Sequence, residues 1–123
     1  MKSLLLVFLG GGIGSALRYL VSRTLNSAPP GFPYGTFIVN IIGSLIIGII
    51  LGFALKHHSP SSNTALFIAT GICGGFTTFS AFSYENVMFL KAGDYQTFII
   101  YTLGSILLGL AAVFTGIWIA KIV

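Results

Sequence analysis

Long apolar segments alternate with short polar connectors along the 123 residues of the chain. Segments without lysine, arginine, aspartate or glutamate are 24–55, 59–84 and 95–120, and segment 3–22 contains only Arg18. A membrane-spanning helix needs about 20 mostly apolar residues, and its backbone groups must be satisfied within the segment. The pattern predicts a single domain over 1–123 with four transmembrane helices, at about 3–23, 35–55, 64–90 and 96–120. We expect the first to be an uncleaved helix, since no clear signal-peptide cleavage site follows it.

Composition favours a membrane protein and argues against several other classes. Charged residues make up 7% of the chain, against about 25% in soluble domains, and the mean hydropathy is +0.99. Cys73 is the only cysteine, which excludes an intramolecular disulfide. The six lysines and arginines are scattered and form no basic patch, and the sequence contains no recognisable nucleophile–base pair, carboxylate dyad or metal cluster. We expect neither a nucleic-acid-binding protein nor an enzyme.

The basic residues give almost no preference for one orientation in the membrane. With four spans and both termini on one side, they divide evenly between the sides: Lys2, Lys56 and Lys121 against Arg18, Arg23 and Lys91. Cytoplasmic loops normally carry an excess of positive charge. Either another signal orients the chain, or the protein inserts both ways and pairs antiparallel, which is the hypothesis we favour. Four helices also enclose little space for a pathway, so we expect an oligomer.

Small residues recur along the second and fourth predicted spans. They are Thr36, Asn40, Ser44, Gly48 and Gly52 in the second and Ser105, Gly109, Ala112 and Gly116 in the fourth. Such stripes let membrane helices approach closely, so these spans are expected to pack tightly.

The third predicted span contains a segment that suits a helix interior poorly. It reads Gly74-Gly75-Phe76-Thr77-Thr78, and adjacent glycines followed by β-branched residues have low helix propensity. We expect a break near 74–78. A break frees carbonyl and amide groups at mid-membrane depth, where protein or a cavity must satisfy them. Freed carbonyls can bind a small cation and helix N-termini attract anions; the alternative is a kink that only improves packing.

Other polar and aromatic residues within the spans are candidates for an ion pathway. The Asn40 amide either lines a pathway or makes an interhelical hydrogen bond. Phe79 and Phe82 lie one turn apart, so their positive ring edges can face an anion without a fixed charge; alternatively both rings face core or lipid. Ser80 lies between them and supplies a hydroxyl. Arg18, late in the first span, either concentrates anions at a vestibule or extends to the interface.

Three segments resemble the Fluc (CrcB) family of fluoride channels. They are GGGIGSALRY at 10–19, GTFIVNIIG at 35–43 and GICGGFTTFSAF at 71–82, in the family's order. The third of these motifs is specific. The resemblance implies an all-α membrane protein that forms a dual-topology antiparallel homodimer with two fluoride pathways. It also implies passive export of fluoride across the bacterial inner membrane, which protects the cell from fluoride toxicity.

The resemblance assigns roles to single residues. Asn40, Phe79 and Phe82 match pathway residues of the family, and Tyr101 and Ser105 match a tyrosine and a serine of its fourth span. It further implies a sodium ion at the dimer centre, held by backbone carbonyls at the positions of Gly74 and Thr77. Two positions depart from the family, which commonly has a hydroxyl where this chain has Ala81 and Gly109.

Two other functions stay open on the residues alone. A small multidrug-resistance-type, proton-coupled antiporter would need a carboxylate in the membrane, and Glu85 is the only acidic residue within a predicted span. A membrane assembly subunit without transport activity would use Asn40 and the two phenylalanines for packing.

Overall fold

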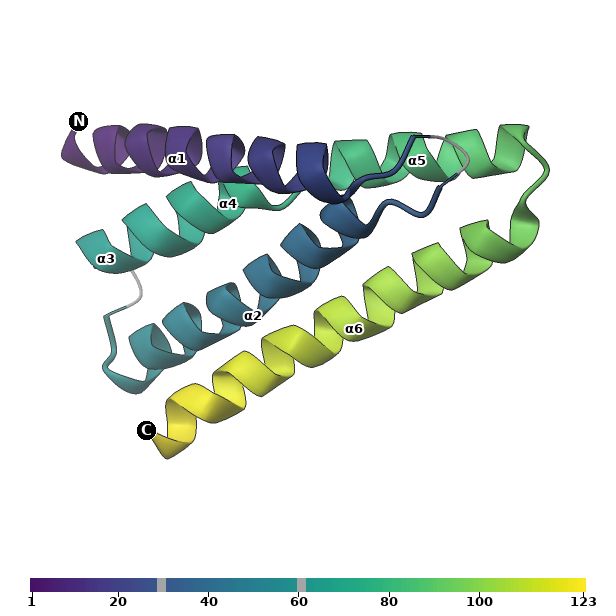
Figure 1. Ribbon diagram of the computed structural model, residues 1–123. Coiled ribbons are helices and arrows are strands. Elements are labelled where there is room, and N and C mark those ends of the chain that lie inside the picture. The colour runs from purple at the N-terminus through teal and green to yellow at the C-terminus, as the bar shows by residue number, and fades with distance from the viewer. Residues whose placement is uncertain (29–30, 60–61) are drawn as a thin grey trace.

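The computed structural model describes residues 1–28, 31–59 and 62–123, which fold into helices joined by short connections (Figure 1). The elements are α1 (Lys2–Leu25), α2 (Tyr34–Lys56), α3 (Asn63–Ala65), η1 (Leu66–Cys73), α4 (Gly74–Phe76), α5 (Phe79–Lys91) and α6 (Tyr95–Ile122). Within these described ranges, four helical segments are long and apolar enough to cross a membrane: Lys2–Leu25, Tyr34–Lys56, Asn63–Lys91 and Tyr95–Ile122. The prediction of an all-α membrane protein with four spans is confirmed.

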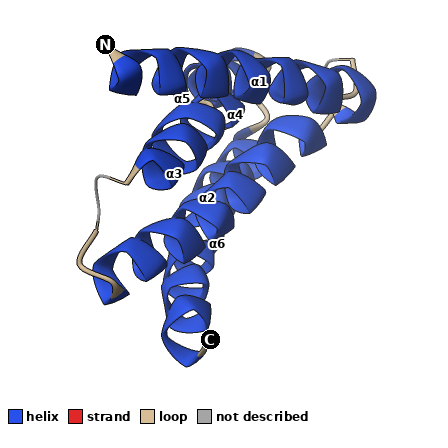
Figure 2. Ribbon diagram, turned by 90° about the vertical axis from the view of Figure 1, so that its left-hand side faces the viewer, coloured by secondary structure: helices blue, strands red, loops and turns tan. Residues whose placement is uncertain are grey.

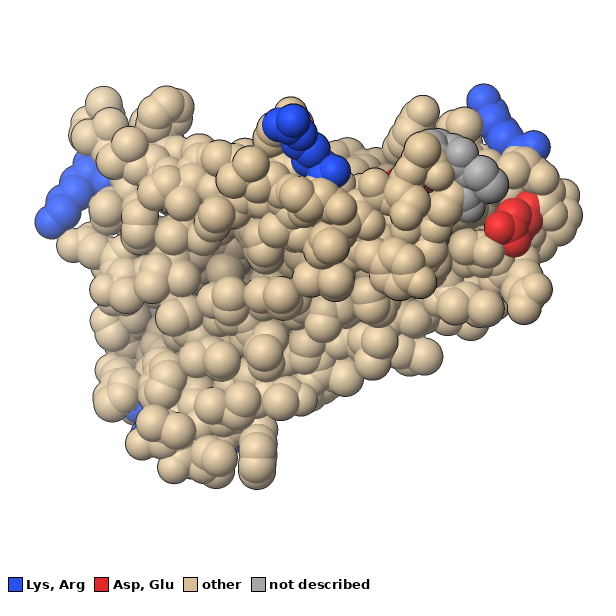
Figure 3. All heavy atoms as spheres, viewed as in Figure 1, with Lys and Arg blue, Asp and Glu red and all other residues tan. Residues whose placement is uncertain are grey.

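Both termini and the connection from α2 to α3 lie at one end of the molecule, at the left in Figure 1. The connections from α1 to α2 and from α5 to α6 lie at the other end. Most of the face shown in Figure 3 carries no charged side chain, and large apolar side chains such as Phe8, Phe114 and Trp118 are 60–74% exposed. Such surfaces suit lipid or another membrane-embedded chain rather than water.

The first span packs against the third through glycines. A Cβ atom on Gly71 would lie 2.9 Å from the Cα atom of Gly10, so neither position has room for a side chain. Gly14 and Gly75 likewise meet backbone atoms of the facing segment. Contacts of this kind bring two helix backbones together and gain dispersion energy along the whole contact.

The second and fourth spans form the other close pair (Figure 2). Gly48 of α2 lies against the backbone of Val113 and Gly116, and a Cβ atom on Gly52 would lie 2.7 Å from the Cβ of Ala120. The small residues that the sequence places along these spans therefore contribute to their contact, as expected.

The third span is interrupted at two residues. α4 ends at Phe76, and Thr77 (ψ 156°) and Thr78 (φ −149°) are extended before α5 begins at Phe79. The predicted break near 74–78 is confirmed. The segment before it, η1, is π-helical, which the sequence did not predict. π-helical turns are rare and often lie near functional sites.

Candidate functional site

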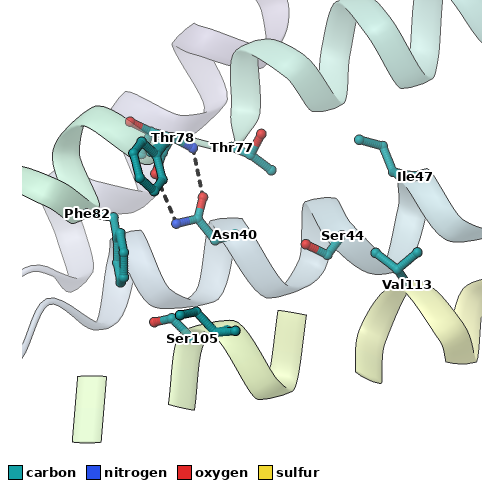
Figure 4. A pocket seen from close by; sticks show the side chains of 10 residues that line it. Asn40, Ser44, Ile47, Thr77, Thr78, Phe82, Ser105 and Val113 are labelled. Atoms are coloured by element: carbon teal, nitrogen blue, oxygen red, sulfur yellow. Dashed lines mark hydrogen bonds between the residues drawn. The ribbon is translucent and has the colours of Figure 1, made fainter. Parts of the chain in front are cut away.

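Asn40 bridges the broken third span to α2. Its Nδ2 donates to the Thr78 carbonyl at 3.1 Å, and its Oδ1 accepts from the Thr78 amide at 2.7 Å (Figure 4). The two bonds replace helical hydrogen bonds that the extended backbone cannot make. Of the two sequence-based interpretations, the interhelical hydrogen bond is therefore present. The same side chain also faces a cavity, so the two interpretations are compatible.

The cavity is a groove of about 390 Å³ between α2, the break and α6. Its lining is mostly apolar, with a few amide and hydroxyl groups. The residues are Asn40, Ser44, Ile47, Thr77, Thr78, Phe79, Phe82, Ser105, Ile106 and Val113. The structure thus brings together four predicted pathway residues: Asn40, Phe79, Phe82 and Ser105.

The two phenylalanines form one wall of this groove. Their ring centroids lie 5.9 Å apart with the planes tilted by 40°. Phe79 is 79% exposed, whereas Phe82 also packs on Tyr101, with ring centroids 5.1 Å apart. Aromatic edges are electropositive, so this wall can attract an anion without a formal charge.

Thr78 caps α5 at the same place. Its Oγ1 accepts a hydrogen bond from the Ala81 amide at 3.2 Å and lies 3.3 Å from Ser80 Oγ. Ser80 is exposed and stands beside the groove, outside its lining residues. The sequence analysis missed the cap, although a threonine before a run of helical residues is its usual signal.

The Ser105 hydroxyl is buried against the groove without a hydrogen-bond partner among the described residues. Buried polar groups in native proteins are nearly always hydrogen-bonded to protein, water or a ligand. Ser105 Oγ therefore has a free donor at the position where the groove meets α6.

Tyr101 is fully buried and lies behind Phe82, outside the groove lining. Its hydroxyl donates to Glu85 Oε2 at 2.7 Å, and Thr36 Oγ1 donates to Glu85 Oε1 at 2.6 Å. Asn26 extends the network by donating to Thr36 Oγ1 at 3.2 Å. The sequence analysis singled out Glu85 and Tyr101 separately and placed Thr36 only among the packing residues of the second span, so it missed the hydrogen bonds that link the three.

A second cavity, of about 310 Å³, lies on the Glu85 side of this network. Glu85 and Asp94, the only two acidic residues of the chain, both line it together with Tyr84 and Phe89. Tyr101 lies between the two cavities and lines neither: its ring packs on Phe82, which lines the first, and its hydroxyl bonds to Glu85, which lines the second.

Arg18 is half-buried, and its Nε donates to the Gly75 carbonyl at 3.0 Å. The side chain thus crosses from α1 to the segment just before the break and is not among the residues lining the groove. It satisfies a carbonyl that the break leaves near the end of α4.

The carbonyls of Gly74 and Thr77 lose their helical partners at the break. In an unbroken α-helix the amides four residues later would donate to them. Instead, the Thr78 amide donates to Asn40, and the Ala81 amide donates to Thr78 Oγ1. Gly74 is exposed and, apart from its chain neighbours and the nearby backbone of its own helix, has no described atom within 4 Å of the place of a Cβ. The described residues contain no cluster of three or more histidine, cysteine, aspartate or glutamate residues, so a cation here would depend on carbonyl oxygens.

Comparison with known proteins relates this sequence to a family. A family model described as "CrcB-like protein, Camphor Resistance (CrcB)" matches residues 5–117. A protein of Phocaeicola vulgatus named fluoride-specific ion channel FluC is 46% identical over 122 residues, covering 98% of this chain and 100% of that protein. A protein of the same name from Gloeothece citriformis is 48% identical, with 98% of both chains covered.

Proposed function

The chain belongs to the CrcB-like protein family, and we propose that it is a fluoride channel of the bacterial inner membrane. It would let cytoplasmic fluoride leave passively and so limit fluoride toxicity. Relatives named fluoride-specific ion channels, 44–48% identical over nearly the whole chain, support this function. The proton-coupled antiporter is not favoured, because both oxygens of Glu85 already accept hydroxyl groups of the protein.

The observation that carries the proposal is the groove that Phe79, Phe82, Asn40 and Ser105 line together, beside which the buried Ser105 hydroxyl has no hydrogen-bond partner among the described residues. A dehydrated fluoride ion is small and accepts strong hydrogen bonds, so it needs donors along its path. Hydroxyl groups and ring edges offer favourable but individually weak contacts, which an ion can both enter and leave. A lysine in the groove would bind the anion too tightly for fast release.

An antiparallel homodimer would complete the site. Gly74, Phe79 and Ser80 are exposed at the break, and polar groups such as the Ser80 hydroxyl are costly in hydrocarbon unless protein covers them. A second copy, inserted the opposite way, is consistent with the even division of basic residues. A cysteine at Ser3 should be labelled from both sides of the membrane; labelling from one side only would contradict dual topology.

We propose that a sodium ion binds the carbonyl oxygens freed at the break. The Gly74 and Thr77 carbonyls have lost their helical donors, and unwound carbonyls are typical ligands of sodium in membrane proteins. Two copies of each carbonyl in a dimer would hold the ion. Its positive charge would stabilise the junction between the subunits. Dimer stability measured with and without sodium tests this assignment, and equal stability would contradict it.

Fluoride efflux from liposomes that contain only this protein tests the function. We expect electrogenic efflux, which Phe79→Ile and Phe82→Ile reduce more than tenfold because the electropositive edges are lost. Phe114→Ile is the matched control, since Phe114 is 73% exposed and is not among the residues that line the groove. Wild-type liposomes without fluoride efflux would contradict the function, and unaffected Phe79 and Phe82 variants would contradict the pathway.

A further inference from the structure

Two neighbouring residues of α5 are bridged to two neighbouring residues of α6. Tyr101 OH donates to Glu85 Oε2 at 2.7 Å, and Thr102 Oγ1 donates to Asn86 Oδ1 at 3.0 Å. Successive residues of an α-helix point about 100° apart. A single bridge leaves α5 free to turn about it, whereas two bridges in different directions fix the rotation of α5 about its own axis.

Asn86 links the bridge to α6 with the backbone of Phe82. Its Nδ2 donates to the Phe82 carbonyl at 3.0 Å while its Oδ1 accepts from Thr102, so both ends of the amide are bonded. The side chain is only 7% exposed, and Asn86 and Thr36 are the buried polar residues of the described part of the chain. A buried amide with both ends satisfied has one orientation available. Asn86 is thus tied to the turn that carries Phe82, although it does not line the groove.

The position of the Phe82 ring depends strongly on the rotation of α5. Side chains extend an α-helix to a diameter of about 10–12 Å, so a turn of roughly 10° moves a ring by about 1 Å. Functional groups generally have to stay within about 0.5 Å of their working position. The Phe82 ring touches both Phe79 and Tyr101, so its displacement changes the whole aromatic wall.

We propose that Asn86 and Thr102 form a positioning pair that fixes the Phe82 ring against the groove and thereby sets conduction rate and anion selectivity. The pair acts through the carbonyl of Phe82 and the rotation of α5. The inference rests on the proposed channel function, since it concerns the same groove. It adds two positioning residues to those that line the groove.

The test uses Asn86→Leu and Thr102→Val in the full chain, reconstituted into liposomes. Each removes the bridge while keeping the branching of the side chain and its number of non-hydrogen atoms. We expect each to lower fluoride efflux per incorporated protein roughly tenfold and to lower the ratio of fluoride to chloride permeation. The double variant should be no slower than the slower single variant, because both changes remove the same bridge. Thr115→Val is the control: Thr115 is exposed on α6 and donates to Ala111 of its own helix at 2.8 Å.

Three results would overturn the positioning pair. The first is lower melting temperatures with unchanged efflux per folded protein and an unchanged anion ratio, which would indicate a purely structural bridge. The second is losses that multiply in the double variant. The third is an equal effect of Thr115→Val. Thr102→Val, which removes a single hydroxyl, carries the test if Asn86→Leu does not fold. Absence of wild-type efflux would refute the channel itself, whereas wild-type efflux with unaffected variants would refute only the pair.

Discussion

The two halves of the third span are attached to the rest of the protein in different ways. Before the break, η1 and α4 lie against α1 mainly through glycine backbones in direct contact, with one side-chain hydrogen bond, from Arg18 to the Gly75 carbonyl. After the break, α5 is connected to α2 and α6 by side-chain hydrogen bonds. These pairs are Asn40–Thr78, Thr36–Glu85, Tyr101–Glu85 and Thr102–Asn86.

The two halves of the span therefore have different roles: the first is held rigidly, and the second can be adjusted. Backbone contacts between glycines leave no room for adjustment, because any added atom forces the helices apart. Each side-chain hydrogen bond within a membrane contributes only about 0.6–2 kcal/mol, so α5 can be altered one bridge at a time. Phe79 and Phe82 stand on the half held by hydrogen bonds, while the half held by glycines acts as the fixed support.

The largest expected effect comes from filling the glycine contact. Gly14→Ala would place a Cβ against backbone atoms of Ile72 and Phe76. We expect the free energy of unfolding to fall by at least about 3 kcal/mol, or the protein not to fold, because backbone atoms cannot move aside as a side chain can. Circular dichroism melting in detergent measures the effect.

Gly12→Ala provides the matched control on the same helix. Apart from its chain neighbours and the nearby backbone of its own helix, Gly12 has no described atom within 4 Å of the place of a Cβ, and alanine favours helix more than glycine. This variant should melt at the wild-type temperature or slightly above. Equal melting of the Gly12 and Gly14 variants would show that the glycine contact does not fix this half of the span.

An intermediate effect is expected from Asn40→Leu, at the junction of the two halves. The change leaves the Thr78 amide without its acceptor and removes the donor to the Thr78 carbonyl. Leaving these groups without hydrogen-bond partners should lower the free energy of unfolding by about 1–3 kcal/mol. The start of α5 would also be less firmly held against α2. Fluoride efflux per folded protein should fall more than tenfold while the protein still folds.

Asn63→Leu is the control for that variant, because it makes the same change at an exposed position in α3. It should retain wild-type efflux. If Asn40→Leu conducted at the wild-type rate, neither the groove nor the junction would depend on the asparagine.

The sequence is sufficient to predict the four spans and the break in the third, but not the side-chain hydrogen bonds that connect α5 to its neighbours. Charge and hydropathy place the four spans, because a chain in lipid must form helices of a minimum length. The Gly-Gly-Phe-Thr-Thr segment predicts the break, because its helix propensity is low. Both signals are local, so each can be seen in a window of a few residues.

The bridges join residues that are far apart in the chain. Asn40 and Thr78 are separated by 38 positions, and Thr36 and Glu85 by 49. Such pairs depend on how α2 and α6 rotate against the third span, which no local pattern determines. For the same reason the sequence could not show that the Tyr101 hydroxyl is bonded to Glu85, or that Arg18 reaches the Gly75 carbonyl. The roles of Tyr101, Ser80 and Arg18 in conduction stay predictions.

The smallest expected effect is that of Thr36→Val, which removes one bridge of α5 and leaves the others. Glu85 would lose the hydroxyl on Oε1 but keep Tyr101 on Oε2. Because both bridges from α5 to α6, Tyr101–Glu85 and Thr102–Asn86, are retained and still fix the rotation of α5, we expect efflux within about threefold of wild type and a melting temperature lower by about 4 °C. Thr24→Val is the control, since Thr24 is exposed and bonds only to Leu20 and Val21 of its own helix. A loss as large as that of Asn40→Leu would mean that the bridges of α5 act as one cooperative network, and the contrast between a rigid half and a separately adjustable half would no longer hold.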